Sequence, residues 1–173
     1  MVSHLVDGWQ ELLGGIACVT DAAADVDAAT YWTGWTADHA DADPVLALMA
    51  QRRRTAAYAR PSLAVAELRS VGEVLVTALD ALQDRPRAFQ GHVLTAGDLC
   101  ATWAVENAVH HLDLLEPPEP PASALGLARA TVEAIAGAVP SSWSDVDTVL
   151  VGAGRRPVPA DAGGVAARLP ALG

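Results

Sequence analysis

Apolar side chains recur at helical spacing along most of the chain, and this pattern predicts a mainly α-helical protein. In residues 2–14 they fall at offsets of three, four and seven, and Gly14-Gly15 is expected to end the helix. Asp43 and Thr95, both good N-cap residues, are expected to start two of the later helices. The later helices are predicted over residues 44–59, 61–83, 95–115 and 123–138.

The segments between these helices have other patterns. Residues 20–43 are rich in Asp and Ala and are expected to form a long, partly ordered loop beside a site. Residues 84–94 are expected to be a turn. The run Val146–Val151, with β-branched residues followed by Gly and Pro, favours a short strand or hairpin. Four prolines in residues 116–123 exclude a helix there, because they fix φ and lack an N–H donor.

These elements predict a three-part organisation. Residues 1–115 are expected to form a helical domain, and residues 116–121 a stiff proline-rich linker. Residues 122–173 are expected to add a helix and a short strand or hairpin. The fold class expected is therefore mainly α, with a small C-terminal α/β appendage.

Composition narrows the choice of partners. The chain has 173 residues, a formal net charge of −10 and no lysine, which argues against nucleic acid as a partner. No apolar run approaches the roughly 18 residues that span a membrane. Cys18 and Cys100 lack the spacing of a redox or zinc motif, and the N-terminus does not resemble a signal peptide. We expect a cytoplasmic protein without a membrane or nucleic-acid partner.

The segment "WAVENAVHHLDLL" carries the candidate chemistry. Glu106 and His110 project from one helical face one turn apart, so both side chains can reach a single metal ion. Asp113 can accept the second imidazole N–H and so fix the ring, whereas His111 is rotated by about 100° and points elsewhere. The alternative is an ordinary surface pair. The sequence has no GxSxG, P-loop or GxGxxG motif that would indicate another catalytic centre. The glycines of "VGAGRR" favour a turn.

A third ligand is expected from another histidine. His4 lies on the apolar-periodic first helix and is the leading candidate, while His39 and His92 in predicted loops are alternatives. A set of two histidines and one glutamate leaves a coordination position open, which is typical of catalytic rather than structural zinc.

Two segments resemble a known family. "SHLVDGWQELLGG" at residues 3–15 and "LTAGDLCATWAVENAVHHLDL" at residues 94–114 are similar to the mycothiol-dependent maleylpyruvate isomerase family of DinB-like metal-dependent four-helix bundles. The resemblance implies a divalent metal, usually zinc, held by His4, Glu106 and His110. It also implies mycothiol as co-substrate and a small electrophilic substrate.

That resemblance leaves two reactions open. A metal acting as a Lewis acid would lower the pKa of the thiol, and the thiolate could then serve an isomerase or an S-transferase. Trp32 and Trp35 could line the site, with Asp38, His39 and Asp41 contacting a sugar-bearing thiol, or the tryptophans could close the core. The alternative function is a non-catalytic metal-binding or dimerisation domain.

The start of the chain departs from the family pattern. Family members have a helix ahead of the histidine, whereas here only three residues precede His4. Either the start of the chain is truncated or this member lacks a bundle helix, and a missing helix would expose apolar surface. We therefore expect a homo-oligomer that associates through the face of Leu5, Trp9 and Leu12.

Overall fold

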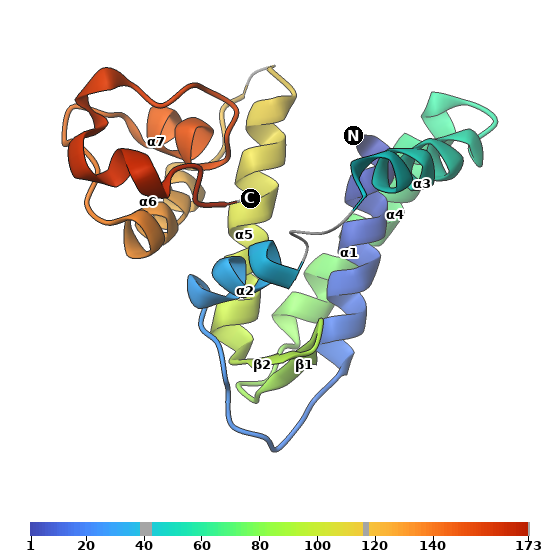
Figure 1. The fold of residues 1–173 in the computed structure, drawn as a ribbon. Coiled ribbons are helices and arrows are strands. Elements are labelled where there is room, and N and C mark those ends of the chain that lie inside the picture. The colour runs from blue at the N-terminus through green and yellow to red at the C-terminus, as the bar shows by residue number, and fades with distance from the viewer. Residues whose placement is uncertain (39–42, 116–117, 173) are drawn as a thin grey trace. The chain divides into compact units, whose positions relative to one another are not determined.

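The computed structural model describes residues 1–38, 43–115 and 118–172 and confirms a mainly α fold (Figure 1). The helices and strands are α1 (Val2–Ala17), α2 (Thr30–Asp38), α3 (Pro44–Ala56), α4 (Pro61–Asp80), β1 (Arg87–Phe89), β2 (His92–Leu94), α5 (Ala96–Asp113), α6 (Ala122–Ala136), α7 (Asp145–Gly152) and the 3-10 helix η1 (Ala160–Arg168). None of the helices in these residues is long and apolar enough to cross a membrane.

The chain forms two compact units. The first unit comprises Met1–Ala24 and Ala40–Ala96, and the second comprises Asp25–His39 and Gly97–Gly173. The division therefore falls at the start of α5, and the proline-rich segment lies within the second unit. As a result, α5 belongs with the C-terminal helices α6 and α7.

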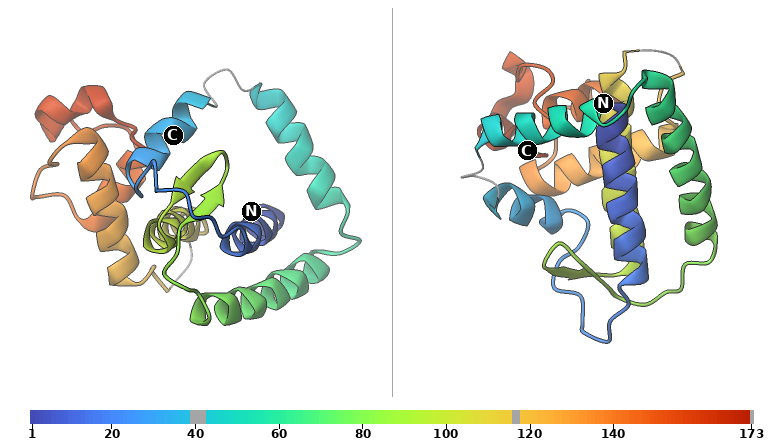
Figure 2. Two further views of the ribbon diagram at one scale, coloured as in Figure 1. Left: turned by 90° about the horizontal axis from the view of Figure 1, so that it is seen from below. Right: turned by 90° about the vertical axis from the view of Figure 1, so that its right-hand side faces the viewer.

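In the first unit, α1 packs along α4 (Figure 2). Trp9 of α1 lies directly against Gly72 of α4, where a Cβ would come within 3.0 Å of the indole ring. Leu12 of the same helix is only 2% exposed. Of the face expected to mediate association, Leu12 is therefore buried within the unit, whereas Leu5 and Trp9 are half-buried.

Contrary to the expectation from its two glycines, α1 does not end at Gly14. It continues to Ala17, and Gly15 serves packing instead, because the ring of Phe89 lies where a Cβ would be, at 2.5 Å. The absence of a side chain thus allows the hairpin to contact α1.

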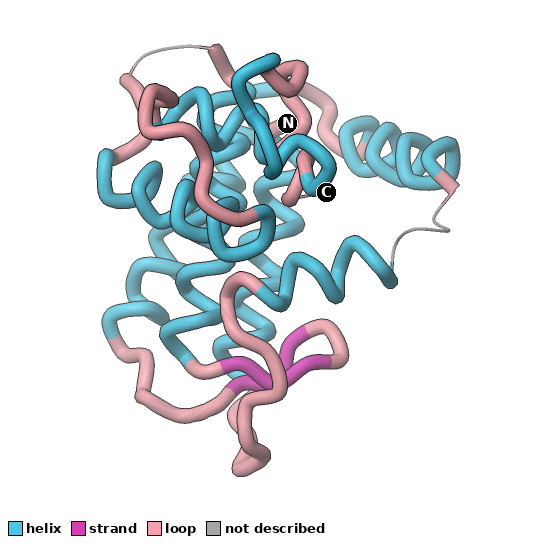
Figure 3. Tube along the Cα trace, turned by 60° about the vertical axis from the view of Figure 1, so that its left-hand side comes forward, coloured by secondary structure: helices cyan, strands magenta, loops and turns pink. Residues whose placement is uncertain are grey.

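The predicted turn at residues 84–94 is in fact an antiparallel hairpin, drawn in Figure 3 as the paired strands. Its turn residues, Gln90 and Gly91, have φ values of +47° and +83°, the backbone that a two-residue hairpin turn needs. The buried Arg87 guanidinium donates to the carbonyl oxygens of Ile16 and Gln83 at 2.8 and 3.1 Å. This arginine therefore ties β1 to the ends of α1 and α4.

In the second unit, residues 30–38 form the helix α2, so the loop predicted for residues 20–43 is wrong over this stretch. The Asp27 carboxylate starts the helix by accepting from the Thr30 N–H at 2.8 Å. Tyr31 and Trp32 are buried and pack edge to face, with ring centroids 5.8 Å apart. Trp32 therefore belongs to the core. The side chains of Trp35 and Asp38 and the whole of His39 and Asp41 lie outside the described part of the chain.

The strand predicted for residues 146–151 is also wrong, because this segment is the helix α7. The Ser144 hydroxyl caps the helix by accepting from the Asp147 N–H at 3.0 Å. α7 packs on α6 where Gly152 meets Val132, with a Cβ position 2.4 Å from a valine methyl. A cap and a close helix contact thus override the β-branched composition, and the C-terminal appendage is helical.

We predict that Gly15→Ala destabilises the protein by about 1–3 kcal/mol, because the added methyl overlaps the buried Phe89 ring. Gly14→Ala is the matched control, since no atom lies within 4 Å of its Cβ position. It should be neutral or stabilising by up to about 1 kcal/mol through helix propensity. Chemical denaturation measures both. Equal effects of the two substitutions would contradict the packing role of Gly15.

Candidate metal centre

The candidate centre lies on α5, whose buried face fixes its orientation. Leu99 and Val105 are fully buried and Val109 is nearly so. Glu106, His110 and Asp113 follow at helical offsets of four and three residues and therefore share one side of the helix. The sequence prediction that these three residues lie together is confirmed by their contacts.

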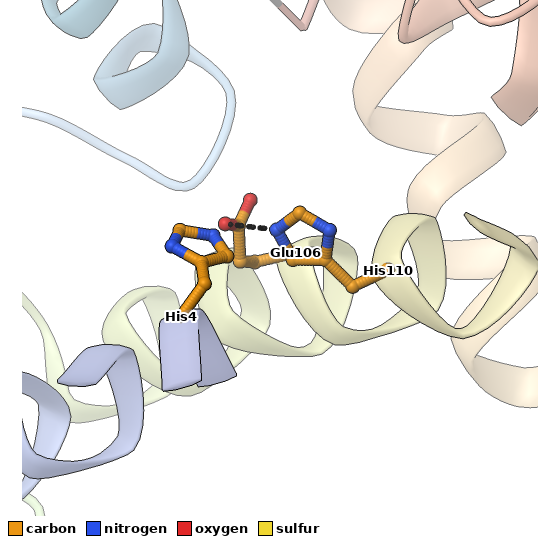
Figure 4. Close-up of side chains that lie close together, drawn as sticks. All are labelled: His4, Glu106 and His110. Carbon is orange, nitrogen blue, oxygen red and sulfur yellow. Dashed lines mark hydrogen bonds and ion pairs between the residues drawn. The ribbon is translucent and has the colours of Figure 1, made fainter. Parts of the chain in front are cut away.

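His110 lies between the two carboxylates of this group. Its Nε2 is 2.9 Å from Oε1 of Glu106, the contact dashed in Figure 4. Its Nδ1 is 3.1 Å from Oδ2 of Asp113. The imidazole ring is therefore held from both of its nitrogens.

The second carboxylate has a further partner that the sequence did not reveal. Arg155 donates from Nε to Oδ1 of Asp113 at 2.9 Å and from Nη2 to Oδ2 at 3.2 Å. The two residues are 42 positions apart, so no periodicity could indicate this contact. The only local signal is the glycine turn "VGAGRR", which the sequence correctly indicated as a turn.

Burial and charge set the protonation of the centre. The hydrogen bond to Glu106 raises the pKa of His110, burial opposes this, and Asp113 adds to the rise. For Asp113, burial acts to raise the pKa, but the hydrogen bonds from Arg155 and His110 outweigh it and lower the pKa. When no metal ion is bound, the raised pKa of His110 favours an imidazolium that donates to both carboxylates.

The same geometry suits a divalent cation. When Nε2 of His110 loses its proton, its lone pair points toward the Glu106 carboxylate. An imidazole nitrogen and a carboxylate oxygen are both ligands that zinc accepts. Asp113 would meanwhile keep the Nδ1 proton in place, which is the common arrangement behind a metal-bound histidine. A proton and a metal ion would thus compete for Nε2.

The other histidines belong to other elements or point to other partners. His4 is half-buried on α1 of the first unit, and His92 is on β2, opposite Phe89 in the hairpin. His39 lies outside the described residues. His111 donates from Nε2 to the carbonyl oxygen of Pro118 at 2.7 Å, which ties α5 to the proline-rich segment. The expectation that His111 points away from the cluster is confirmed.

Comparison with known proteins adds no relative. No protein-family model, no curated protein and no solved structure matches the chain. The function is therefore inferred from the residues of the candidate centre.

We predict a pH-dependent contribution of His110 to the stability of the metal-free protein. Its pKa in the folded state is raised above 6.5, so its stabilisation is complete below pH 6.5 and is lost as the pH rises through the raised pKa. The difference in free energy of unfolding between wild type and His110→Gln should therefore shrink as the pH rises. His111→Gln is the control. A difference that grows with pH would contradict the arrangement.

Proposed function

We propose that the protein binds one divalent metal ion, Zn²⁺ in the cell, through His4, Glu106 and His110. The observation that carries this proposal is the 2.9 Å contact between Nε2 of His110 and the Glu106 carboxylate, two ligand atoms on one side of a largely buried helix. The Glu106 carboxylate is partly buried, and a proton or a metal cation between it and the imidazole would offset the cost of that burial. The Asp113 contact supports the metal, because it leaves Nε2 as the coordinating nitrogen.

His4 is the proposed third ligand. The resemblance of residues 3–15 to the maleylpyruvate isomerase family supports it, because it implies two histidines and one glutamate as the ligand set. Three such ligands leave a position for an exogenous group, which favours a catalytic over a structural metal.

We further propose that the protein is a mycothiol-dependent isomerase or S-transferase that acts on a small electrophile. The resemblance of residues 3–15 and 94–114 to the maleylpyruvate isomerase family supports this class. A bound divalent ion supplies Lewis acidity that lowers the pKa of a thiol at the open position. In this function, Asp113 keeps the Nδ1 proton of His110 in place, and the low pKa of Asp113 keeps it an acceptor at neutral pH.

The alternative is a non-catalytic domain that binds metal and self-associates. The observation that favours it is the apolar surface of α3, where Val45, Leu46 and Leu48 are 63%, 68% and 50% exposed. Contiguous exposed apolar surface is typical of a protein interface. A second copy of the chain is the partner we propose for this surface.

We predict that the purified protein binds one equivalent of Zn²⁺ or Co²⁺ and that His110→Ala abolishes stoichiometric binding, because it removes a ligand. Asp113→Asn should weaken binding about 10- to 100-fold, since it removes only the support behind the ligand. His111→Ala is the matched control on the adjacent residue and should bind like wild type. Elemental analysis and metal titration measure these effects. Unchanged metal content in His110→Ala would refute the ligand assignment.

We predict that a small thiol, added to the cobalt-loaded protein, produces a sulfur-to-cobalt charge-transfer band, because a thiolate takes the open position. Absorption spectroscopy during thiol titration measures it, with an alcohol of matched shape as the control. If the fully loaded protein shows no band at saturating thiol, the thiol-dependent function is wrong. A solution mass above 17.9 kDa would in that case favour the self-associating domain.

A further inference from the structure

We propose that Arg155 is a positioning residue for the metal centre. It fixes the Asp113 carboxylate, and through that carboxylate it fixes the imidazole ring of His110. This role deepens the proposed metal function and rests on it, although the contact between Arg155 and Asp113 belongs to the chain itself.

The backbone after α7 sets the position of Arg155. Gly154 has a φ of +67° and its N–H donates to the Val151 carbonyl at 3.1 Å, while the Arg155 N–H donates to the Leu150 carbonyl at 2.7 Å. These two bonds form a Schellman motif, the helix ending that favours glycine in the left-handed conformation. The Arg155 guanidinium also donates to the Ala153 carbonyl at 3.0 Å. The side chain is thus held from the end of α7.

The ion pair between Arg155 and Asp113 is bidentate and partly buried. Both Asp113 oxygens accept from the planar guanidinium, at 2.9 and 3.2 Å, and the Asp113 side chain is only 17% exposed. A paired donation of this kind fixes the plane of the carboxylate, which a single ammonium group cannot do. Because Oδ2 also accepts from Nδ1 of His110, fixing this plane orients the imidazole ring.

The neighbouring residue offers a matched comparison. Arg156 also follows α7, but its guanidinium pairs with Asp147 at the start of that helix. It has about the same exposure as Arg155, at 52% against 41%, and within the described residues its side chain pairs with Asp147 and not with α5. A general effect of removing a cation from this turn should therefore appear equally in variants of both arginines, whereas positioning should appear only with Arg155.

The first test is the metal affinity of Arg155→Ala, Arg155→Lys and the control Arg156→Ala, measured by Co²⁺ titration. Arg155→Ala should weaken binding about 10-fold, the lower end of the loss expected for an indirect partner. Arg155→Lys should recover part of this loss, and Arg156→Ala should bind like wild type. In an Asp113→Asn background, Arg155→Ala should have no further effect, because its route to His110 is already lost.

The second test needs no metal. The proton NMR spectrum of chelator-treated protein below pH 6.5 should show a slowly exchanging Nδ1–H signal of His110 in wild type and Arg156→Ala. Arg155→Ala should lose this signal while its circular dichroism stays unchanged. Retention of the signal with wild-type metal affinity would overturn the proposal, as would an equal loss of affinity in the Asp113→Asn background. If wild type binds no metal, the proposed function fails, and the NMR result still decides the role of Arg155.

Discussion

The placement of one imidazole between two carboxylates is the constraint around which the second unit is organised. His110 contacts Glu106 at one ring nitrogen and Asp113 at the other, and the helical period alone brings these three residues together. Two carboxylates around a largely buried ring demand a positive charge between them. In the metal-free protein the raised pKa of His110 favours a proton there, and in our proposal a divalent ion replaces that proton at Nε2. The centre therefore has two charge-balanced states that use the same side chains.

The second carboxylate makes the centre depend on structure far from α5. Asp113 is too buried to be stabilised by water alone, and Arg155 supplies the missing donors. The left-handed conformation of Gly154 sets the position of Arg155. The C-terminal residues in turn hold the end of α7, because the N–H groups of Ala171 and Leu172 donate to the Gly152 carbonyl at 2.8 and 2.9 Å. The C-terminal helices are thus more than an appendage, because their last turn supports a side chain of the centre.

The sequence could predict those features that depend on neighbouring residues alone. The group of Glu106, His110 and Asp113 follows from helical spacing, and the cap at Asp43 follows from side-chain chemistry, with its carboxylate accepting from the Val45 N–H at 2.8 Å. Two predictions were wrong where capping and tertiary contacts determine the secondary structure. Residues 146–151 look like a strand, but the Ser144 cap and the fit of Gly152 on Val132 make them helical. Gly15 looks like a helix stop, but it makes room for Phe89. Apart from the glycine turn before it, Arg155 had no sequence signal, because its partner is a distant aspartate.

A crystal structure of the zinc-loaded protein would show whether His110 is a metal ligand oriented by Asp113. Anomalous diffraction collected on either side of the zinc absorption edge locates the metal without reference to the protein atoms. We expect one strong peak bonded to Nε2 of His110 and to a carboxylate oxygen of Glu106, at the usual zinc distances of about 2.0–2.2 Å, with Nδ1 still hydrogen-bonded to Asp113. A peak on other residues, or a fully loaded protein whose zinc is bound through Nδ1 of His110, would contradict it.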